Sequence, residues 1–358
     1  MTSRPAAPNG PARPDAKRRI SPGSSSPIPS GTRDVLPQEM AELRAIEASL
    51  AALFDSRGYG EVATPTIEFN DVLEQGDPSG PSAYRFFDES GATLALRGDM
   101  TVPIARLVAN RFDPADKPFR LRYSGRAYRP VTQSGQLREF RQVGVELIGE
   151  PGPAGTIEII ELLVGALDEI GLERALIGLG DADLYRQLLD EMGVDGPARD
   201  RILECLISHD LVAIEAEAGD LADLGDAERT AIVALSNLRG GSEVLEKART
   251  IGGSAVERAS SRLLETYEGL KAAGIADRVQ LDLGLLRDLD YYSGAILEVY
   301  DPALGHTLGG GGRYDELLGR FGKPMPAAGF ALYLERVHVA QAAQRAASGK
   351  QRAAGGDL

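Results

Sequence analysis

Residues 119–148 constrain the fold most strongly, because two alternating stretches flank a polar loop. The stretches are 119–129 and 138–148, and the loop is 130–137. Period-two alternation on both sides of a turn predicts an antiparallel strand pair. Since side chains alternate along a strand, Gln142 and Glu146 should share one face of the second strand. By itself this pattern is equally consistent with a half-exposed strand and with a polar site.

The remaining chain alternates between strand-like and helix-like patterns. Helical spacing of apolar residues begins near Gln38 and returns at 156–169 and throughout 194–273. Strands are predicted at 59–67, 175–180, 279–286 and 295–300, and a short hairpin is predicted over 85–97. These patterns predict an α+β fold in which an antiparallel sheet is flanked by helices and carries a helical insertion.

The same patterns divide the chain into five segments. Residues 1–30 are rich in Pro, Ser, Ala and Gly and should form a disordered tail. The first part of the core is expected at 31–193, the helical insertion at 194–273 and the second part of the core at 274–340. The Ala/Gly/Gln-rich segment 341–358 is expected to be a flexible tail.

Composition excludes several classes of site. The formal charge of -14 disfavours general nucleic-acid binding, which relies on cationic contacts with phosphates. Cys205 is the one cysteine, and the three histidines are far apart, so we predict no disulfide and no metal site. The sequence has no signal-peptide pattern and no apolar run long enough for a bilayer, which predicts a cytoplasmic protein without membrane attachment.

Four stretches resemble class II aminoacyl-tRNA synthetases, and specifically histidyl-tRNA synthetases. Tyr-x-Gly-x-x-Tyr-Arg at 123–129, followed by Arg-Glu-Phe-x-Gln-x-Gly-x-Glu-x-Ile-Gly at 138–149, resembles motif 2. Arg-x-Leu-Asp-Tyr-Tyr at 287–292 is similar to the histidine-specific motif of these enzymes. Residues 326–336 resemble motif 3. The segment from 31 to 67 resembles motif 1, which forms the homodimer interface in that family.

The resemblance implies a pocket for histidine. The residues at the matching positions are Asp99, Thr101, Arg129, Gln142, Glu146, Arg287, Tyr291 and Tyr292. Asp99 stands where the family has a glutamate that holds the amino group, although Asp99 and Thr101 also suit a helix N-cap. Glu146 and Tyr292 would contact the imidazole, and Arg129 or Gln142 would contact the carboxylate.

Three departures distinguish the chain from an active synthetase. About twenty residues follow Arg336, too few for the anticodon-binding domain, because an independent domain needs ~50 or more. Val131 replaces the glutamate that contacts adenine. Tyr333 replaces the motif 3 glycine and should fill the adenine pocket. Arg287, by contrast, matches an arginine of the activation centre and could hold either a carboxylate or a phosphate.

This combination resembles the regulatory subunits of ATP phosphoribosyltransferase, which are synthetase-like proteins of histidine biosynthesis. The resemblance implies a non-catalytic protein without a cofactor that senses L-histidine and activates a short-form catalytic subunit. It also implies a homodimer within a larger hetero-oligomer, and no tRNA. The alternative is a histidine-adenylating enzyme of the histidyl-tRNA synthetase type that lacks the anticodon-binding domain.

Overall fold

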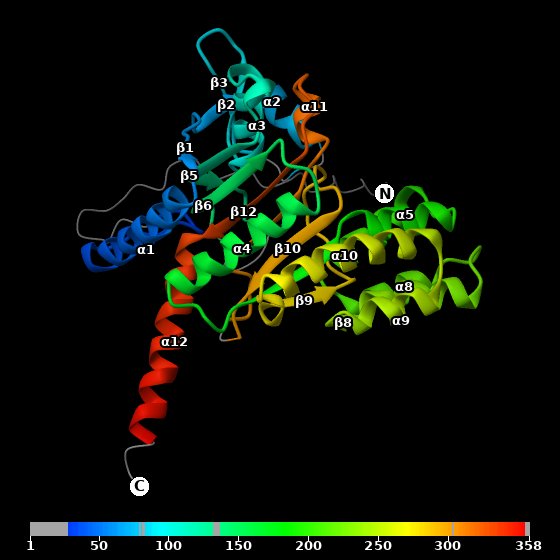
Figure 1. Cartoon of the computed structure of the whole chain (residues 1–358). Helices are drawn as coiled ribbons and strands as arrows, with labels where there is room; N and C mark the ends of the chain where they lie inside the picture. The colour runs from blue at the N-terminus through cyan, green and yellow to red at the C-terminus, as the bar shows by residue number, and fades with distance from the viewer. Residues whose placement is uncertain (1–27, 79, 81–82, 132–136, 303, 355–358) are drawn as a thin grey trace, which may run out of the picture.

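The computed structural model describes residues 28–78, 80, 83–131, 137–302 and 304–354 (Figure 1). Most of the tail predicted at 1–30 lies outside the described residues, and so do 132–136 of the loop predicted at 130–137.

Within the described residues, one mixed sheet of nine strands forms the core, in the order β1-β5-β6-β12-β11-β10-β7-β9-β8. The strands are β1 Gly60–Glu61, β5 Phe119–Tyr128, β6 Glu139–Ile148, β7 Leu176–Asp181, β8 Arg239–Gly240, β9 Val279–Asp282, β10 Ala295–Tyr300, β11 Gly309–Arg313 and β12 Ala327–Tyr333. Two neighbouring pairs, β1 with β5 and β7 with β9, are parallel, and the other neighbours are antiparallel. The α+β prediction is therefore confirmed, and so is the antiparallel pairing of β5 with β6.

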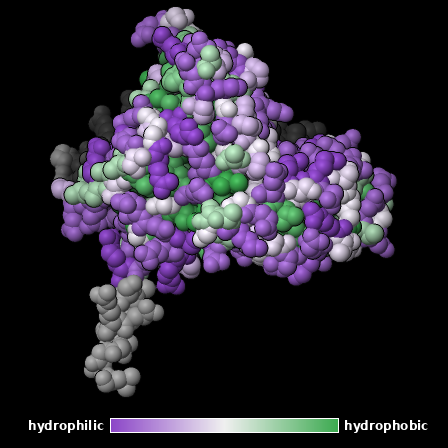
Figure 2. Space-filling model, in the orientation of Figure 1, coloured by the Kyte–Doolittle hydropathy of each residue, from purple (hydrophilic) through white to green (hydrophobic). Residues whose placement is uncertain are grey.

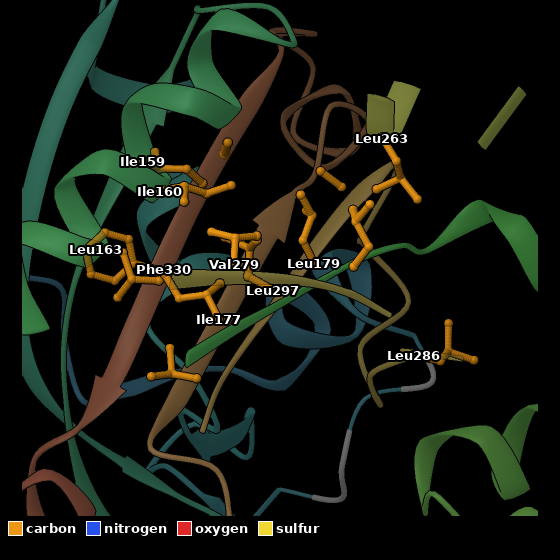
Figure 3. Close-up of a cluster of buried hydrophobic side chains, with 14 of the residues drawn as sticks. Ile159, Ile160, Leu163, Ile177, Leu179, Leu263, Val279, Leu286, Leu297 and Phe330 are labelled. Atoms are coloured by element: carbon orange, nitrogen blue, oxygen red, sulfur yellow. The ribbon is translucent and has the colours of Figure 1, made fainter. Parts of the chain in front are cut away.

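Helices cover both faces of this sheet. On one face lie α1 Pro37–Ser56, α4 Ala154–Glu169 and α10 Ser254–Ala272. Figure 3 shows Ile159 and Leu163 of α4 directed toward Phe330 and the strands beneath them. On the other face lie α3 Thr101–Arg111 and α11 Leu317–Arg320, whose apolar residues form a second buried cluster.

A small sheet lies beside α3, in the order β2-β4-β3 among the described residues (Figure 1). Its strands are β2 Ile67–Phe69, β3 Arg85–Phe87 and β4 Thr93–Leu96, and the short helix α2 Asn70–Gly76 connects β2 to the segment before β3. The predicted hairpin over 85–97 is confirmed by the antiparallel pairing of β3 with β4.

The helical insertion lies at the β8 and β9 end of the large sheet (Figure 1). Its helices, after α5 Asp183–Glu191, are α6 Gly196–Ile207, α7 Leu211–Gly219, α8 Asp226–Ser236, α9 Glu243–Ile251 and α10. Hydrophilic residues cover most of the visible outer surface of this region (Figure 2). The bidentate pair between Arg262 of α10 and buried Asp181 of β7 ties the insertion to the sheet, at 2.8 and 2.9 Å.

Two predicted strands are shorter than expected. The strand predicted at 59–67 ends at Glu61 and resumes at Ile67, because the Arg97 side chain binds the carbonyl of Thr64 at 2.7 Å and Pro65 has no N–H. The strand predicted at 279–286 ends at Asp282, whose carboxylate accepts a hydrogen bond from the Gly284 N–H at 3.0 Å and closes a local turn.

Other segments also differ from prediction. Strand β8 lies within 194–273, where helices alone were predicted. Helix α12 runs from Leu334 to Ala354, so it continues through most of the segment predicted to be a flexible tail, 341–358. Alanine, glutamine and arginine are strong helix formers, and Gln341 also donates to the carbonyl of Ile170 at 2.6 Å.

Candidate functional site

All eight residues of the predicted pocket line one cavity on the face of the sheet that carries α3. Asp99 and Thr101 lie at the start of α3, and Arg129 directly follows β5. Gln142 and Glu146 lie on β6, and Arg287, Tyr291 and Tyr292 lie between β9 and β10. The cavity is also lined by Leu289, Gly310, Tyr314, Gly329, Phe330, Ala331 and Tyr333.

Glu146 forms the acidic floor of the cavity. Its side chain is 1% exposed, and it accepts hydrogen bonds from Thr101 Oγ1 at 2.8 Å and from the Tyr314 hydroxyl. Burial raises the pKa of this carboxyl from 4.5 to about 8, although the hydroxyl donors oppose the rise. The facing strand β12 has Gly329 in register, and a Cβ there would lie 1.9 Å from Glu146 Oε2. Glycine at 329 therefore makes room for the carboxylate.

A second buried carboxylate belongs to Asp99. The Tyr291 hydroxyl donates to its Oδ2 at 3.0 Å, and the backbone N–H of Val102 also donates to this carboxylate. Burial raises the pKa of Asp99, and the positive charge of Arg129 opposes that rise. The expectation of an N-cap at Asp99 or Thr101 is wrong in position, since Met100 is the N-cap residue of α3. Asp99 still binds a free N–H of the first turn.

Guanidinium groups and an amide face these acids. Arg129 is fixed by a hydrogen bond from its Nε to the carbonyl of Gly98, at 2.8 Å. Among the described residues, buried Gln142 Oε1 and Arg287 Nε have no hydrogen-bond partner. A buried unpaired polar atom costs about 1–3 kcal/mol, so these two atoms are suited to a polar ligand.

Tyr333 closes one side of the cavity at the end of β12. Its ring packs edge to face against Phe140, with 5.4 Å between centroids, and the Arg336 guanidinium lies 4.6 Å from the centroid of the tyrosine ring. Burial acts to raise the pKa of this phenol, but three arginine charges and a hydrogen bond from Arg287 together outweigh burial and lower it below its usual value. Those charges belong to Arg129, Arg287 and Arg336.

The cavity is small in this conformation. The space open to the centre of a water-sized sphere is about 20 Å³, and one water needs ~10–15 Å³ by the same measure. Side chains of the lining therefore fill most of the volume between the acids and the guanidinium groups. A ligand of amino-acid size requires some of them to move.

Tyr314 and Gly329 have no role that the sequence alone suggests. Tyr314 follows a run of four glycines, 309–312, and its hydroxyl binds Glu146. Such a run by itself suggests backbone that approaches a ligand closely. In the structure it forms most of β11, and a Cβ at Gly310 would lie 1.7 Å from Arg287 Nη1, so this glycine makes room for an arginine of the chain. The adjacency of the glycine run to Tyr314 was the signal available in the sequence.

Two further properties concern the whole described chain. No helix within the described ranges is long and apolar enough to cross a membrane. No cluster of three or more His, Cys, Asp or Glu side chains in the same ranges could hold a metal ion.

Comparisons with known proteins agree with this architecture. Residues 31–337 match the family model described as histidyl-tRNA synthetase. The chain is 44% identical to the ATP phosphoribosyltransferase regulatory subunit of Moorella thermoacetica, over 92% of this chain and 86% of that protein. It is 40% identical to the regulatory subunit of Rubrobacter xylanophilus, over 86% of this chain and 75% of that protein.

Solved structures give the same result. A Bacillus halodurans protein described as an ATP phosphoribosyltransferase regulatory subunit/histidyl-tRNA synthetase superposes with a TM-score of 0.79 at 32% identity, covering 88% of this chain and 83% of that one. A histidyl-tRNA synthetase from Nostoc superposes with a TM-score of 0.72 at 21% identity, covering 87% and 74%, which shows the shared fold. The chain belongs to the family of ATP phosphoribosyltransferase regulatory subunits, which have a histidyl-tRNA synthetase-like fold.

Proposed function

We propose that this regulatory subunit senses L-histidine in the cavity between β6, β12 and α3. The observation that carries the proposal is the arrangement of charge in one cavity. Carboxylates of Asp99 and Glu146 lie with guanidinium groups of Arg129 and Arg287 in its lining. This arrangement matches a zwitterionic amino acid whose side chain also carries N–H donors.

Each part of histidine has a partner in this proposal. Asp99 accepts from the ammonium group, and Arg129, Arg287 or Gln142 binds the carboxylate. Glu146 and Tyr292 contact the imidazole, and Thr101 orients Glu146 through its 2.8 Å hydrogen bond. Hydrogen bonds to charged groups contribute about 1.5–3 kcal/mol each, so a few of them suffice for micromolar affinity.

The surroundings of Tyr333 support sensing without adenylation. Tyr333 lies against Arg336 and Phe140, where the family has a glycine beside the nucleotide. Val131 offers no acceptor to an adenine amino group. Membership in a regulatory family sets aside the alternative of a histidine-adenylating enzyme. We therefore expect no histidine-dependent exchange between ATP and pyrophosphate in the pure protein, and measurable exchange would contradict this part of the proposal.

The proposed assembly is a homodimer that pairs with a short-form ATP phosphoribosyltransferase catalytic subunit, without tRNA. One face of the small sheet supports a second copy, because Ile67, Phe69 and Phe86 are 47%, 54% and 37% exposed on it. Leu94 and Leu96 lie between them in register. We expect Phe69→Asp to convert the dimer to a monomer in light scattering. A wild-type protein that is monomeric at micromolar concentration would exclude the homodimer.

Titration calorimetry tests the sensor directly. L-histidine should bind, and D-histidine and glutamine serve as ligand controls. The chain has 11 tyrosines and no tryptophan. Tyr291, Tyr292, Tyr314 and Tyr333 all line the cavity, so tyrosine emission should change on binding. Absence of both heat and emission change with folded protein would remove histidine sensing from the proposal.

A further inference from the structure

Glu298 is a buried carboxylate outside the eight predicted residues. It lies on β10, its residue is 8% exposed, and it shares a face of the sheet with Ile296 and Tyr300. The Tyr300 hydroxyl donates to its Oε2. A buried acid without partners is costly, so the groups that face Glu298 explain why the chain keeps it.

Arg287 is the partner on the cavity side. Its Nη1 lies 3.5 Å from Glu298 Oε1 and donates to the carbonyl of Leu297 at 3.3 Å. Across β11, Gly310 is in register with Glu298, and a Cβ at 310 would collide with that same Nη1. Gly310 of β11 thus makes room for the guanidinium that lies beside Glu298 of β10, and its Nε has no hydrogen-bond partner within the part of the chain that the structure describes.

His209 is the partner on the side of the insertion. It closes the turn between α6 and α7 with a φ of 54°, and its Nε2 lies 3.6 Å from Glu298 Oε2. The neighbouring carboxylate of Glu298 raises the pKa of His209, against the opposing effect of burial. One carboxylate therefore contacts both the helical insertion and an arginine of the cavity.

We propose that Glu298 is a positioning residue that holds Arg287 for the carboxylate of the bound amino acid, and that His209 makes the insertion part of this support. The proposal rests on histidine sensing as the function of the cavity. It adds that affinity for the ligand carboxylate depends on the contact between Glu298 and His209 of the insertion.

Calorimetry with two ligands tests the positioning role. L-histidine carries the carboxylate, and L-histidinol replaces it with a hydroxymethyl group. We expect Glu298→Ala to weaken histidine binding about tenfold and to change histidinol binding less than twofold. Glu298→Gln keeps an acceptor for Arg287 Nη1 and should restore most of the histidine affinity.

Glu68→Ala is the matched control. Glu68 is also a buried acid of a strand, 8% exposed and paired with Arg106 at 2.7 Å, but it lies on β2 of the small sheet, apart from the insertion and β10. This variant should leave the ratio of the two affinities unchanged. If Glu298→Ala loses affinity for histidine and histidinol equally, Glu298 has only a structural role and the proposal is overturned. Histidine binding that is unchanged or stronger in this variant would also overturn it.

His209→Asn tests the contribution of the insertion, since asparagine tolerates a positive φ. We expect histidine affinity to fall two- to fivefold with histidinol affinity unchanged, and no difference would remove the insertion from the proposal. If the wild-type protein binds no histidine, the proposed function fails by itself. In that case, crystal structures of the wild type and of Glu298→Ala test the positioning role of Glu298. An Arg287 guanidinium that keeps its place in the variant would overturn that role.

Discussion

Glu146→Gln should have opposite effects on stability and on ligand binding. Glutamine has nearly the same shape as glutamate and cannot ionise. The pKa of Glu146 is raised by burial from 4.5 to about 8. The folded state therefore favours the protonated form, so the stabilising contribution of this group is complete below pH 4.5 and is lost as the pH rises through about 8.

The size of this loss follows from the pKa shift. One pKa unit corresponds to ~1.36 kcal/mol, so the shift amounts to on the order of 4–5 kcal/mol between pH 4.5 and pH 9. The amide oxygen of glutamine accepts fewer hydrogen bonds than the carboxylate does from Thr101 and Tyr314, and each lost bond costs about 1 kcal/mol. With about 2 kcal/mol lost from the two hydrogen bonds, we therefore expect the variant to be about 3 kcal/mol more stable than wild type at pH 9 and about 1 kcal/mol less stable at pH 5.

Urea unfolding at pH 5, 7 and 9 measures the crossover, and calorimetry at pH 7 measures histidine binding in the same preparations. Binding should weaken at least tenfold, because glutamine cannot release a proton and so cannot become the charged acceptor for the imidazole of the bound ligand. Glu158→Gln is the control. Burial acts to raise the pKa of Glu158, but hydrogen bonds from Arg120 and Tyr59 lower it overall, so this variant should lose stability at neutral pH and keep its histidine affinity. A Glu146→Gln protein that is less stable than wild type at every pH would refute the reasoning.

Three further variants test individual contacts, each by urea unfolding. Gly310→Ala brings a Cβ to 1.7 Å from Arg287 Nη1, so it should cost about 1–3 kcal/mol and weaken histidine binding; unchanged stability would contradict the packing described. Asp181→Ala removes the bidentate partner of Arg262 and should cost about 1–3 kcal/mol, and a change below 0.5 kcal/mol, roughly the surface average, would show that this pair does not anchor the insertion. Arg313→Leu leaves polar partners of a guanidinium that is 6% exposed unsatisfied and should cost about 2 kcal/mol, whereas equal or greater stability would contradict a structural role.

Much of the fold was predictable because its signals are local. Alternation over 119–129 and 138–148 predicted β5 and β6, and helical spacing predicted α1 and α4. Strand ends were less predictable, because they depend on contacts between distant residues. The 59–67 segment is interrupted by a hydrogen bond from Arg97, and β8 exists because two residues of the insertion pair with β9.

The site was predictable through motifs and not through local pattern. All eight predicted residues line one cavity because the start of α3, motif 2 and the histidine-specific motif, which are distant in sequence, meet on one face of the sheet. Glu298 belongs to none of these motifs, and in the sequence it is a single acid within a predicted strand. Its importance depends on its distances to Arg287 and His209, which only the folded chain provides. The histidine-binding roles themselves stay predictions.

Formation of phosphoribosyl-ATP by a short-form ATP phosphoribosyltransferase catalytic subunit tests the central claim most directly. The reaction should be measured with the catalytic subunit alone, with this chain added, and with both proteins plus L-histidine, using Glu146→Ala as the variant that cannot sense. The account predicts that this chain raises the activity, that histidine lowers it, and that Glu146→Ala activates but resists histidine. Activation that histidine inhibits equally in wild type and Glu146→Ala would contradict sensing in this cavity, and the absence of any activation would contradict the proposed partnership.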